Sequence, residues 1–369
     1  MSLKLASRDA FSALLLDWFD IHGRHDLPWQ HPRSAYRVWI SEVMLQQTQV
    51  GTVLGYFERW MQRFPDLKTL SNAALDDVLA AWSGLGYYAR ARNIKRAADF
   101  CATQLNGELP TTLEGWLKLP GVGPSTAAAV LAQAFGARAA ILDGNVKRVL
   151  ARISAQLEPI DSPSGIRSLQ ALADSLLPHS RLADYTQAQM DLGATLCTQR
   201  DPACTRCPVE RLCQAKAQQQ VAQFPIKAKR LKRKHRHIRW LVCQREDGAI
   251  LLEQRPPSGI WGALRSFPEC PTDAKGAEIV AQLFALKVTN SRALDTFTHA
   301  FTHFDLTIEP LLLSVSETSV RETATELREA SSERFYKPSV AMSLGLPQPV
   351  RKLLIALEFS QLTDHPTEQ

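Results

Sequence analysis

The sequence predicts a multidomain protein: an all-α domain, a basic linker, and a smaller α+β domain. Three observations carry this prediction. The chain of 369 residues is long for a single hydrophobic core. Apolar residues recur with helical spacing up to about residue 215, and the pattern changes to strands and turns from about residue 237. We expect the domain boundaries 1–220, 221–236 and 237–369.

The N-terminal domain is expected to be helical throughout. No apolar run reaches the ~18 residues that a membrane span requires, and Asp17 and Asp20 interrupt the first apolar stretch, which argues against a signal peptide. We therefore expect a cytoplasmic protein, and a monomer, because no feature marks a dimer interface. The predicted helices are 7–22, 34–48, 50–63, 75–81, 90–105, 112–118, 124–135, 143–154, 165–176 and 184–195.

The stretch LPGVGPST at 119–126 predicts a tight connection between two helices. Gly121 and Gly123 permit a sharp backbone turn, and Pro124 suits the first position of the next helix. Such a helix–hairpin–helix exposes the backbone N–H groups of Gly121, Val122 and Gly123 beside a helix N-terminus, where a DNA phosphate can bind. A glycine-rich connection without a ligand is the alternative.

Basic residues support a polyanionic partner. The net charge is +6, and residues 227–239 contain eight Lys or Arg, two His and no acid. The same composition also suits a solvated linker.

Four of the seven cysteines lie together in a C-x6-C-x2-C-x5-C pattern: Cys197, Cys204, Cys207 and Cys213. Because no secretion signal is present, a four-thiolate metal site is more economical than disulfides. This donor set suits either zinc or an iron–sulfur cluster.

Two acidic residues are candidates for catalysis. Glu42 lies in a predicted helix near Trp39, Val43 and Met44, and apolar surroundings raise the pKa of a carboxyl group, which suits a general acid. Asp143 precedes Gly144 and a helix, so a simple N-cap is its default interpretation.

Taken together, the hairpin, the Asp143 segment and the cysteine loop resemble the helix–hairpin–helix DNA glycosylase superfamily of the endonuclease III type. The stretches SEVMLQQTQV, GLGYYARARN, ILDGNVKRV and YTQAQMDLGATLC are similar to its adenine glycosylase branch, the MutY type. The resemblance covers nearly the whole chain. It implies a [4Fe–4S] cluster at the four cysteines and double-stranded DNA with A:8-oxoguanine or A:G mispairs as the partner.

The resemblance also implies residue roles. Glu42 protonates adenine N7, and ionised Asp143 stabilises the positively charged sugar. Arg24, Trp29 and Gln187 surround the extruded adenine, whereas Gln46 and Tyr87 fill the space that it leaves.

The residue at position 125 separates two kinds of glycosylase. Relatives that also cut the strand carry a lysine at the position of Ser125, and a hydroxyl group cannot form a Schiff base. We therefore expect a monofunctional enzyme, with Lys147 a phosphate contact or surface charge. The alternatives are an endonuclease III-like glycosylase and lyase acting on oxidised pyrimidines, and a non-catalytic iron–sulfur DNA-binding protein.

The C-terminal domain resembles a Nudix-like domain that recognises 8-oxoguanine. The segments 237–245 and 249–255 flank a turn and predict a hairpin, and 293–313 predicts two further strands. Thr302 and His303 match a loop that touches the oxidised base. Residues 272–284 lack the glutamate array of Nudix hydrolases, so we expect no hydrolase activity.

Overall fold

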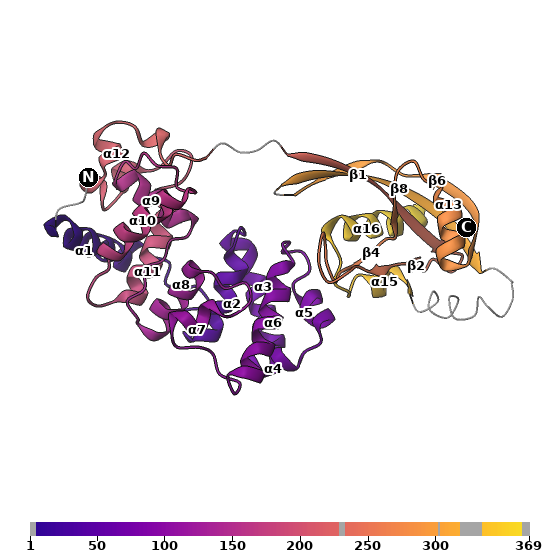
Figure 1. The fold of residues 1–369 in the computed structure, drawn as a ribbon, viewed down its shortest axis with the longest axis horizontal. Helices are drawn as coiled ribbons and strands as arrows, with labels where there is room; N and C mark the ends of the chain where they lie inside the picture. Colours follow the sequence, from indigo (N-terminus) through magenta and orange to yellow (C-terminus); the bar gives the residue numbers. More distant parts are fainter. Residues whose placement is uncertain (1–4, 229–232, 302, 318–333, 364–369) are drawn as a thin grey trace. The chain divides into compact units, whose positions relative to one another are not determined.

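The computed structural model describes residues 5–228, 233–301, 303–317 and 334–363. The chain divides into two compact units (Figure 1). Unit 1 contains residues 1–72 and 93–230, and unit 2 contains residues 73–92 and 231–369. Within the described residues, no helix combines the length and apolar character needed to cross a membrane.

Helices account for the ordered structure up to residue 217, as the sequence predicts. They begin and end close to the predicted positions because side-chain caps and prolines mark their first turns. Residues 67–72 form a helix that the sequence analysis missed, because six residues are too few for a periodic pattern. The helices are α1 (Leu5–His22), α2 (Ala35–Leu45), α3 (Val50–Arg63), α4 (Leu67–Asn72), α5 (Leu75–Ala81), α6 (Ala89–Gln104), α7 (Leu113–Leu117), α8 (Pro124–Phe135), α9 (Gly144–Ile153), α10 (Pro163–Ser175), α11 (Leu182–Asp191) and α12 (Gln214–Ala217).

The core of unit 1 is built around α8, α9 and α11. Helix α8 packs against both α2 and α11, and α1 packs along α11. Phe11, Leu15, Leu150, Tyr185 and Ala188 are fully buried in this core. The small side chains of α8 (Ala127, Ala128, Ala129) are also buried, so neighbouring helices approach it closely and bring the residues near positions 42, 143 and 187 together.

Unit 2 is a mixed sheet with helices. Its strand order is β6-β8-β1-β2-β9; β8 runs parallel to β1, whereas β6 and β7 pair with β8 in the antiparallel sense. The strands are β1 (Lys234–Arg245), β2 (Ile250–Leu251), β3 (Glu253–Gln254), β4 (Arg265–Ser266), β5 (Glu269–Cys270), β6 (Leu286–Ala293), β7 (Phe297–Ala300), β8 (Phe304–Glu317) and β9 (Phe335–Tyr336). The helices are α13 (Gly276–Phe284), α15 (Pro338–Ala341) and α16 (Gln348–Thr363), together with α5 and the first residues of α6 from the segment 73–92.

The strands predicted at 237–245 and within 293–313 are present, whereas the predicted strand 249–255 is divided into β2 and β3, which pair with different strands. Gln244 of β1 pairs with Ile250 of β2 across the predicted turn, and β7 pairs with β8 from Phe297 opposite Ile308 to Ala300 opposite Asp305. Strand β1 begins at Lys234 and so includes the end of the span expected to be linker.

Candidate active site in the helical unit

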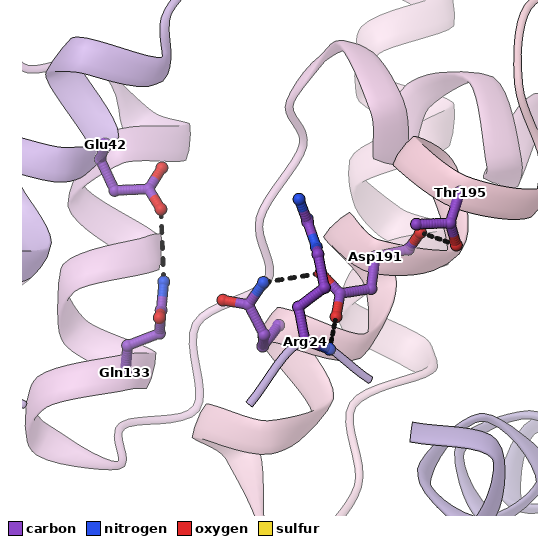
Figure 2. A network of polar contacts seen from close by, with 6 residues as sticks. Arg24, Glu42, Gln133, Asp191 and Thr195 are labelled. Atoms are coloured by element: carbon purple, nitrogen blue, oxygen red, sulfur yellow. Dashed lines mark hydrogen bonds and ion pairs between the residues drawn. The ribbon is translucent and has the colours of Figure 1, made fainter. Parts of the chain in front are cut away.

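Glu42 is a partly buried acid on α2. The helix begins after Ser34, whose hydroxyl accepts from the N–H of Arg37 at 3.3 Å. The Glu42 carboxylate accepts from Nε2 of Gln133, on the facing helix α8, at 3.3 Å (Figure 2). The pKa of Glu42 is raised to about 8, mainly by burial and to a smaller extent by the nearby charge of Asp143. This carboxyl group therefore holds its proton at neutral pH.

Asp143 occupies the N-cap of α9, as its default interpretation predicts. Its Oδ1 accepts from the N–H of Val146 at 2.7 Å. Burial raises the pKa of Asp143, whereas backbone N–H groups and then the charges of Arg148 and Lys147 act in the opposite direction. A helix N-terminus favours a negative charge at this position.

The two carboxyl groups are close enough for the charge of one to raise the pKa of the other. Their surroundings differ, because Asp143 has backbone donors and two nearby cations whereas Glu42 has one neutral amide donor, Gln133. The donors and cations around Asp143 favour its ionised form, whereas burial with one neutral donor favours the protonated form of Glu42.

A second polar network connects residues that the sequence analysis placed around the extruded base. Asp191, on α11 and fully buried, accepts from the backbone N–H of Arg24 at 2.7 Å and from its guanidinium at 2.6 and 2.8 Å (Figure 2). It also accepts from Nε2 of Gln187, one helical turn earlier, at 2.7 Å. The hydroxyl of Thr195 donates to the Asp191 carbonyl at 2.8 Å.

Sequence reasoning missed Asp191 and Gln133. The spacing of four residues between Gln187 and Asp191 places both on one helix face, and this was the available signal. Within the described residues, the buried Oε1 atoms of Gln187 and Gln133 have no hydrogen-bond donor. They are acceptors available to a ligand.

Trp29 and Gln46 also belong to unit 1. Trp29 is 2% exposed and packs edge-on against Phe57 of α3, with ring centroids 5.5 Å apart. Gln46 caps the end of α2, and its Nε2 donates to Oγ1 of Thr126 on α8 at 3.3 Å. Trp29 is therefore a core residue in this structure, whereas Gln46 is tied to the first turn of the helix that follows the hairpin.

The hairpin 119–126 has the predicted form. Pro124 is the first residue of α8, and Gly121 has a φ of +77°. A Cβ atom at Gly121 would lie 2.5 Å from the side-chain amide of Asn93, so this position requires glycine for both reasons. The N–H of Val122 donates to the carbonyl of Leu119 at 3.2 Å.

The glycine amides of the hairpin differ from that of Val122. Gly121 and Gly123 are exposed, and within the described residues their N–H groups have no recorded acceptor. The hydroxyl of Ser125 accepts from the N–H of Leu142 at 3.2 Å. The hairpin is thereby joined to the segment that leads into Asp143.

The four clustered cysteines line one pocket of unit 1: Cys197, Cys204, Cys207 and Cys213. Arg152, which is 2% exposed, donates to Sγ of Cys197 at 3.3 Å. Burial, and to a lesser degree the other thiols, raise the pKa of Cys207 to about 12. Thiolates here need compensating positive charge, and Arg152 supplies part of it. Among the described residues, no three His, Cys, Asp or Glu side chains are placed to hold a single metal ion.

The remaining predicted residues belong to unit 2. Tyr87 has a φ of +48° and is 50% exposed, with the guanidinium of Arg90 5.6 Å from its ring centroid. His303 is exposed between β7 and β8, and Thr302 lies outside the described residues. Helix α13, where a Nudix hydrolase carries its glutamates, has Glu278 as its one acid.

Two family models match the chain. Residues 40–170 match the HhH-GPD superfamily of base excision DNA repair proteins, and residues 239–356 match the NUDIX domain. Together with the helix–hairpin–helix and the paired acids, these matches define the class: a base excision repair glycosylase with an appended NUDIX domain.

Known relatives specify the class further. The chain is 33% identical to the adenine DNA glycosylase of Buchnera aphidicola subsp. Schizaphis graminum over 347 residues, which are 93% of this chain and 97% of that protein. It is 34% identical to the adenine DNA glycosylase of Homo sapiens over 403 residues, 92% of this chain and 73% of the relative. The chain belongs to the adenine DNA glycosylase family. It is a DNA repair enzyme that removes adenine, and the resemblance drawn from the sequence is confirmed.

Solved structures agree on the fold of the helical part. A thermostable thymine-DNA glycosylase is 28% identical, with a TM-score of 0.53, over 58% of this chain and 98% of that one. A non-covalent endonuclease III–DNA complex has 22% identity and a TM-score of 0.51, over 59% and 98%. The second likeness concerns the fold alone.

Proposed function

We propose that this enzyme removes adenine paired with 8-oxoguanine or guanine from duplex DNA and leaves the strand intact. The observation that carries the proposal is the carboxyl pair: Glu42, protonated at neutral pH, beside Asp143 at a helix N-terminus. Removing adenine opposite 8-oxoguanine prevents G:C to T:A mutations. We further propose that the protein acts as a monomer in the cytoplasm, at the nucleoid, with 1–220 as glycosylase domain, 221–236 as linker and 237–369 as lesion-recognition domain.

Catalysis begins with an adenine swung out of the base stack. Arg24 and Gln187, both held by Asp191, define one side of the proposed base pocket. The buried Oε1 of Gln187 is a suitable acceptor for the exocyclic amino group of adenine. By the family resemblance, Trp29 supplies apolar packing beside the base.

Breaking the glycosidic bond places negative charge on adenine and positive charge on the sugar. Glu42 donates its proton to adenine N7, which makes the base a better leaving group. Ionised Asp143 stabilises the oxocarbenium-like sugar until water attacks. The same division between an acid and a carboxylate operates in glycoside hydrolysis.

The DNA backbone is held without reading its sequence. The exposed N–H groups of Gly121 and Gly123 are suited to bind a phosphate at the start of α8. Val122 contributes by shaping the turn, since its own N–H donates to Leu119. Gln46 and Tyr87 occupy the space left by the adenine.

Ser125 makes the enzyme monofunctional. Its hydroxyl cannot form the Schiff base that a lysine forms with the opened sugar. It instead joins the hairpin to the segment before Asp143. Lys147, whose charge acts on Asp143, is a phosphate contact.

We propose that Cys197, Cys204, Cys207 and Cys213 hold a [4Fe–4S] cluster. The four thiols line one pocket, the rest of which is largely apolar, beside the buried cation of Arg152. Four thiolates suit an iron–sulfur cluster or zinc, and the family resemblance favours the cluster. The bound cluster would order the loop 197–213.

The NUDIX domain recognises the base opposite adenine. Phe301 packs on Trp261, with ring centroids 5.4 Å apart, and fixes the start of the loop that contains Thr302 and His303. The lone Glu278 on α13 provides too few carboxylates for the metal ions of a Nudix hydrolase. The domain therefore binds a lesion without hydrolysing a nucleotide.

One assay tests these proposals together. Duplexes carrying A opposite 8-oxoguanine, A opposite G, or thymine glycol are incubated with the protein and analysed before and after alkali. We expect abasic sites in the first two duplexes, and broken strands only after alkali. Cleavage at thymine glycol without alkali would instead support the endonuclease III-like alternative, and intact DNA throughout would support a non-catalytic protein.

A further inference from the structure

The loop that carries Tyr87 belongs to the same compact unit as the NUDIX domain, although 138 residues of unit 1 separate the two segments in sequence. Within the loop, Gly84 and Gly86 have φ values of +102° and +71°, beside +48° at Tyr87. Nε1 of Trp82 donates to the carbonyl of Gly86 at 3.1 Å. The loop thus has a defined, sharply turned backbone.

Tyr88, the neighbour of Tyr87, ties this loop to the NUDIX domain. Its hydroxyl donates to the carbonyl of Leu346 at 2.6 Å and accepts from the N–H of Gly84 at 3.2 Å. The side chain is buried, with 6% exposed. One hydroxyl group therefore bridges the two ends of the Tyr87 loop and the C-terminal segment.

Arg351 makes a second connection, to Ser83 at the start of the loop. Its Nη2 donates to the hydroxyl of Ser83 and to the carbonyl of Met342, each at 2.9 Å. Nearby, the backbone of Gly345 approaches Leu79 of α5 so closely that a Cβ atom would lie 2.9 Å from the leucine Cβ. Polar and apolar contacts together hold residues 79–88 on the domain.

Arg92 connects the Tyr87 segment to the backbone beside Trp261. Its Nη1 donates to the carbonyl of Gly262 at 2.7 Å. The preceding residue, Trp261, packs against the ring of Phe301, and His303 follows two residues later. A continuous set of contacts therefore runs from Phe301, through Trp261 and Gly262, to the segment that carries Tyr87.

We propose that Tyr88, Arg92 and Arg351 are positioning residues through which the NUDIX domain sets the placement of Tyr87 in the duplex. This inference rests on the proposed function, in which the domain contacts the base opposite adenine and Tyr87 occupies the distorted stack. When 8-oxoguanine binds the domain, these residues hold Tyr87 at the position in the duplex where it promotes adenine extrusion. A different base binds the domain less well, so Tyr87 is placed less accurately and adenine is removed more slowly.

Single-turnover rates of adenine release test the proposal, measured opposite 8-oxoguanine and opposite guanine with the full-length protein. Tyr88→Phe keeps the ring and removes only the bridging hydroxyl, and Arg351→Met removes the bond to Ser83. For each variant we expect the ratio of the two rates to fall, roughly threefold to tenfold, as for the loss of one buried hydrogen bond. Arg334→Met is the matched control, because Arg334 bonds Glu253 on the domain surface.

A double-mutant cycle separates positioning from simple destabilisation. If Tyr88 acts through Tyr87, Tyr88→Phe should leave the rate ratio unchanged in a Tyr87→Ala background. Thermal melting of each variant shows whether the fold is retained, and the ratio is read at a temperature where all variants are folded.

The outcomes are distinct. If the wild-type protein prefers 8-oxoguanine and the variants keep that preference in full, the positioning role is overturned. The proposed function then remains in place. Equal rates opposite both bases in the wild-type protein overturn the inference and the proposed recognition of 8-oxoguanine by the NUDIX domain, but not the proposed removal of adenine. A lowered ratio that persists undiminished in the Tyr87→Ala background shows that the bonds act on something other than Tyr87, and also overturns the inference.

Discussion

The Glu42→Gln substitution should make the folded protein more stable at alkaline pH while it removes the proposed acid. In the folded protein the pKa of Glu42 is raised from 4.5 to about 8, chiefly by burial. Between these two pH values the folded state keeps a proton that the unfolded state has released. The free energy of unfolding therefore falls as pH rises through this window.

The magnitude follows from the two pKa values. At ~1.4 kcal/mol per pH unit, ionising Glu42 costs about 5 kcal/mol more in the folded than in the unfolded state. Solvent access and relaxation make this an upper limit. Small domains have total stabilities of ~5–15 kcal/mol, so even a third of the effect is measurable. A glutamine carries no titrating proton and escapes this penalty.

Urea denaturation of the wild-type and variant proteins from pH 4.5 to 9 measures the effect. We expect the stability of Glu42→Gln relative to wild type to rise by ~2–5 kcal/mol over this range and to level off above about pH 8. Glu58→Gln, on the exposed face of α3, is the control and should leave the pH profile unchanged. Parallel curves for the wild-type protein and Glu42→Gln would refute a raised pKa at Glu42.

Three further substitutions test other parts of the site. Asp191→Asn should lower the free energy of unfolding, measured in urea, by ~3 kcal/mol, because Arg24 and Gln187 lose a buried charged acceptor. A change below ~0.5 kcal/mol would show that this network does not stabilise the fold. Ser125→Lys should introduce strand cleavage and an adduct that borohydride traps on DNA, neither of which we expect from the wild-type protein. Gly121→Ala should weaken binding to undamaged duplex DNA and lower the free energy of unfolding by at least ~1 kcal/mol, because φ is +77° and the new Cβ would clash with Asn93. Unchanged DNA binding and melting temperature would contradict the role of the turn.

Local signals made the helices and strands predictable. Ser34, Pro124 and Asp143 each mark the start of a helix, and the turn Glu246-Asp247-Gly248 separates two paired strands. These patterns depend on residues a few positions apart. Helix α4 was missed because it is too short to show a period.

The proposed catalytic pair was predictable in part. The apolar neighbours of Glu42 indicate a raised pKa, and the structure agrees in direction. The proximity of Asp143 followed from the family resemblance rather than from the spacing of 101 residues between the two acids.

Contacts between distant segments were not predictable from local pattern. Asp191 meets Arg24 across 167 residues, and Tyr88 meets Leu346 across 258. Neither spacing leaves a periodic trace in the sequence. The membership of residues 73–92 in the second compact unit arises from the same kind of long-range packing.

The most direct test of the account is the pH dependence of adenine release in a single turnover, with the protein saturated by a duplex carrying A opposite 8-oxoguanine. We predict a rate that falls as pH rises through about 8 in the wild-type protein, and a rate ~10²–10⁴-fold lower in Glu42→Gln that lacks this fall while DNA binding persists. Release by Glu42→Gln at the wild-type rate, or a wild-type rate that stays constant to pH 10, would contradict the role of Glu42 as the proton donor.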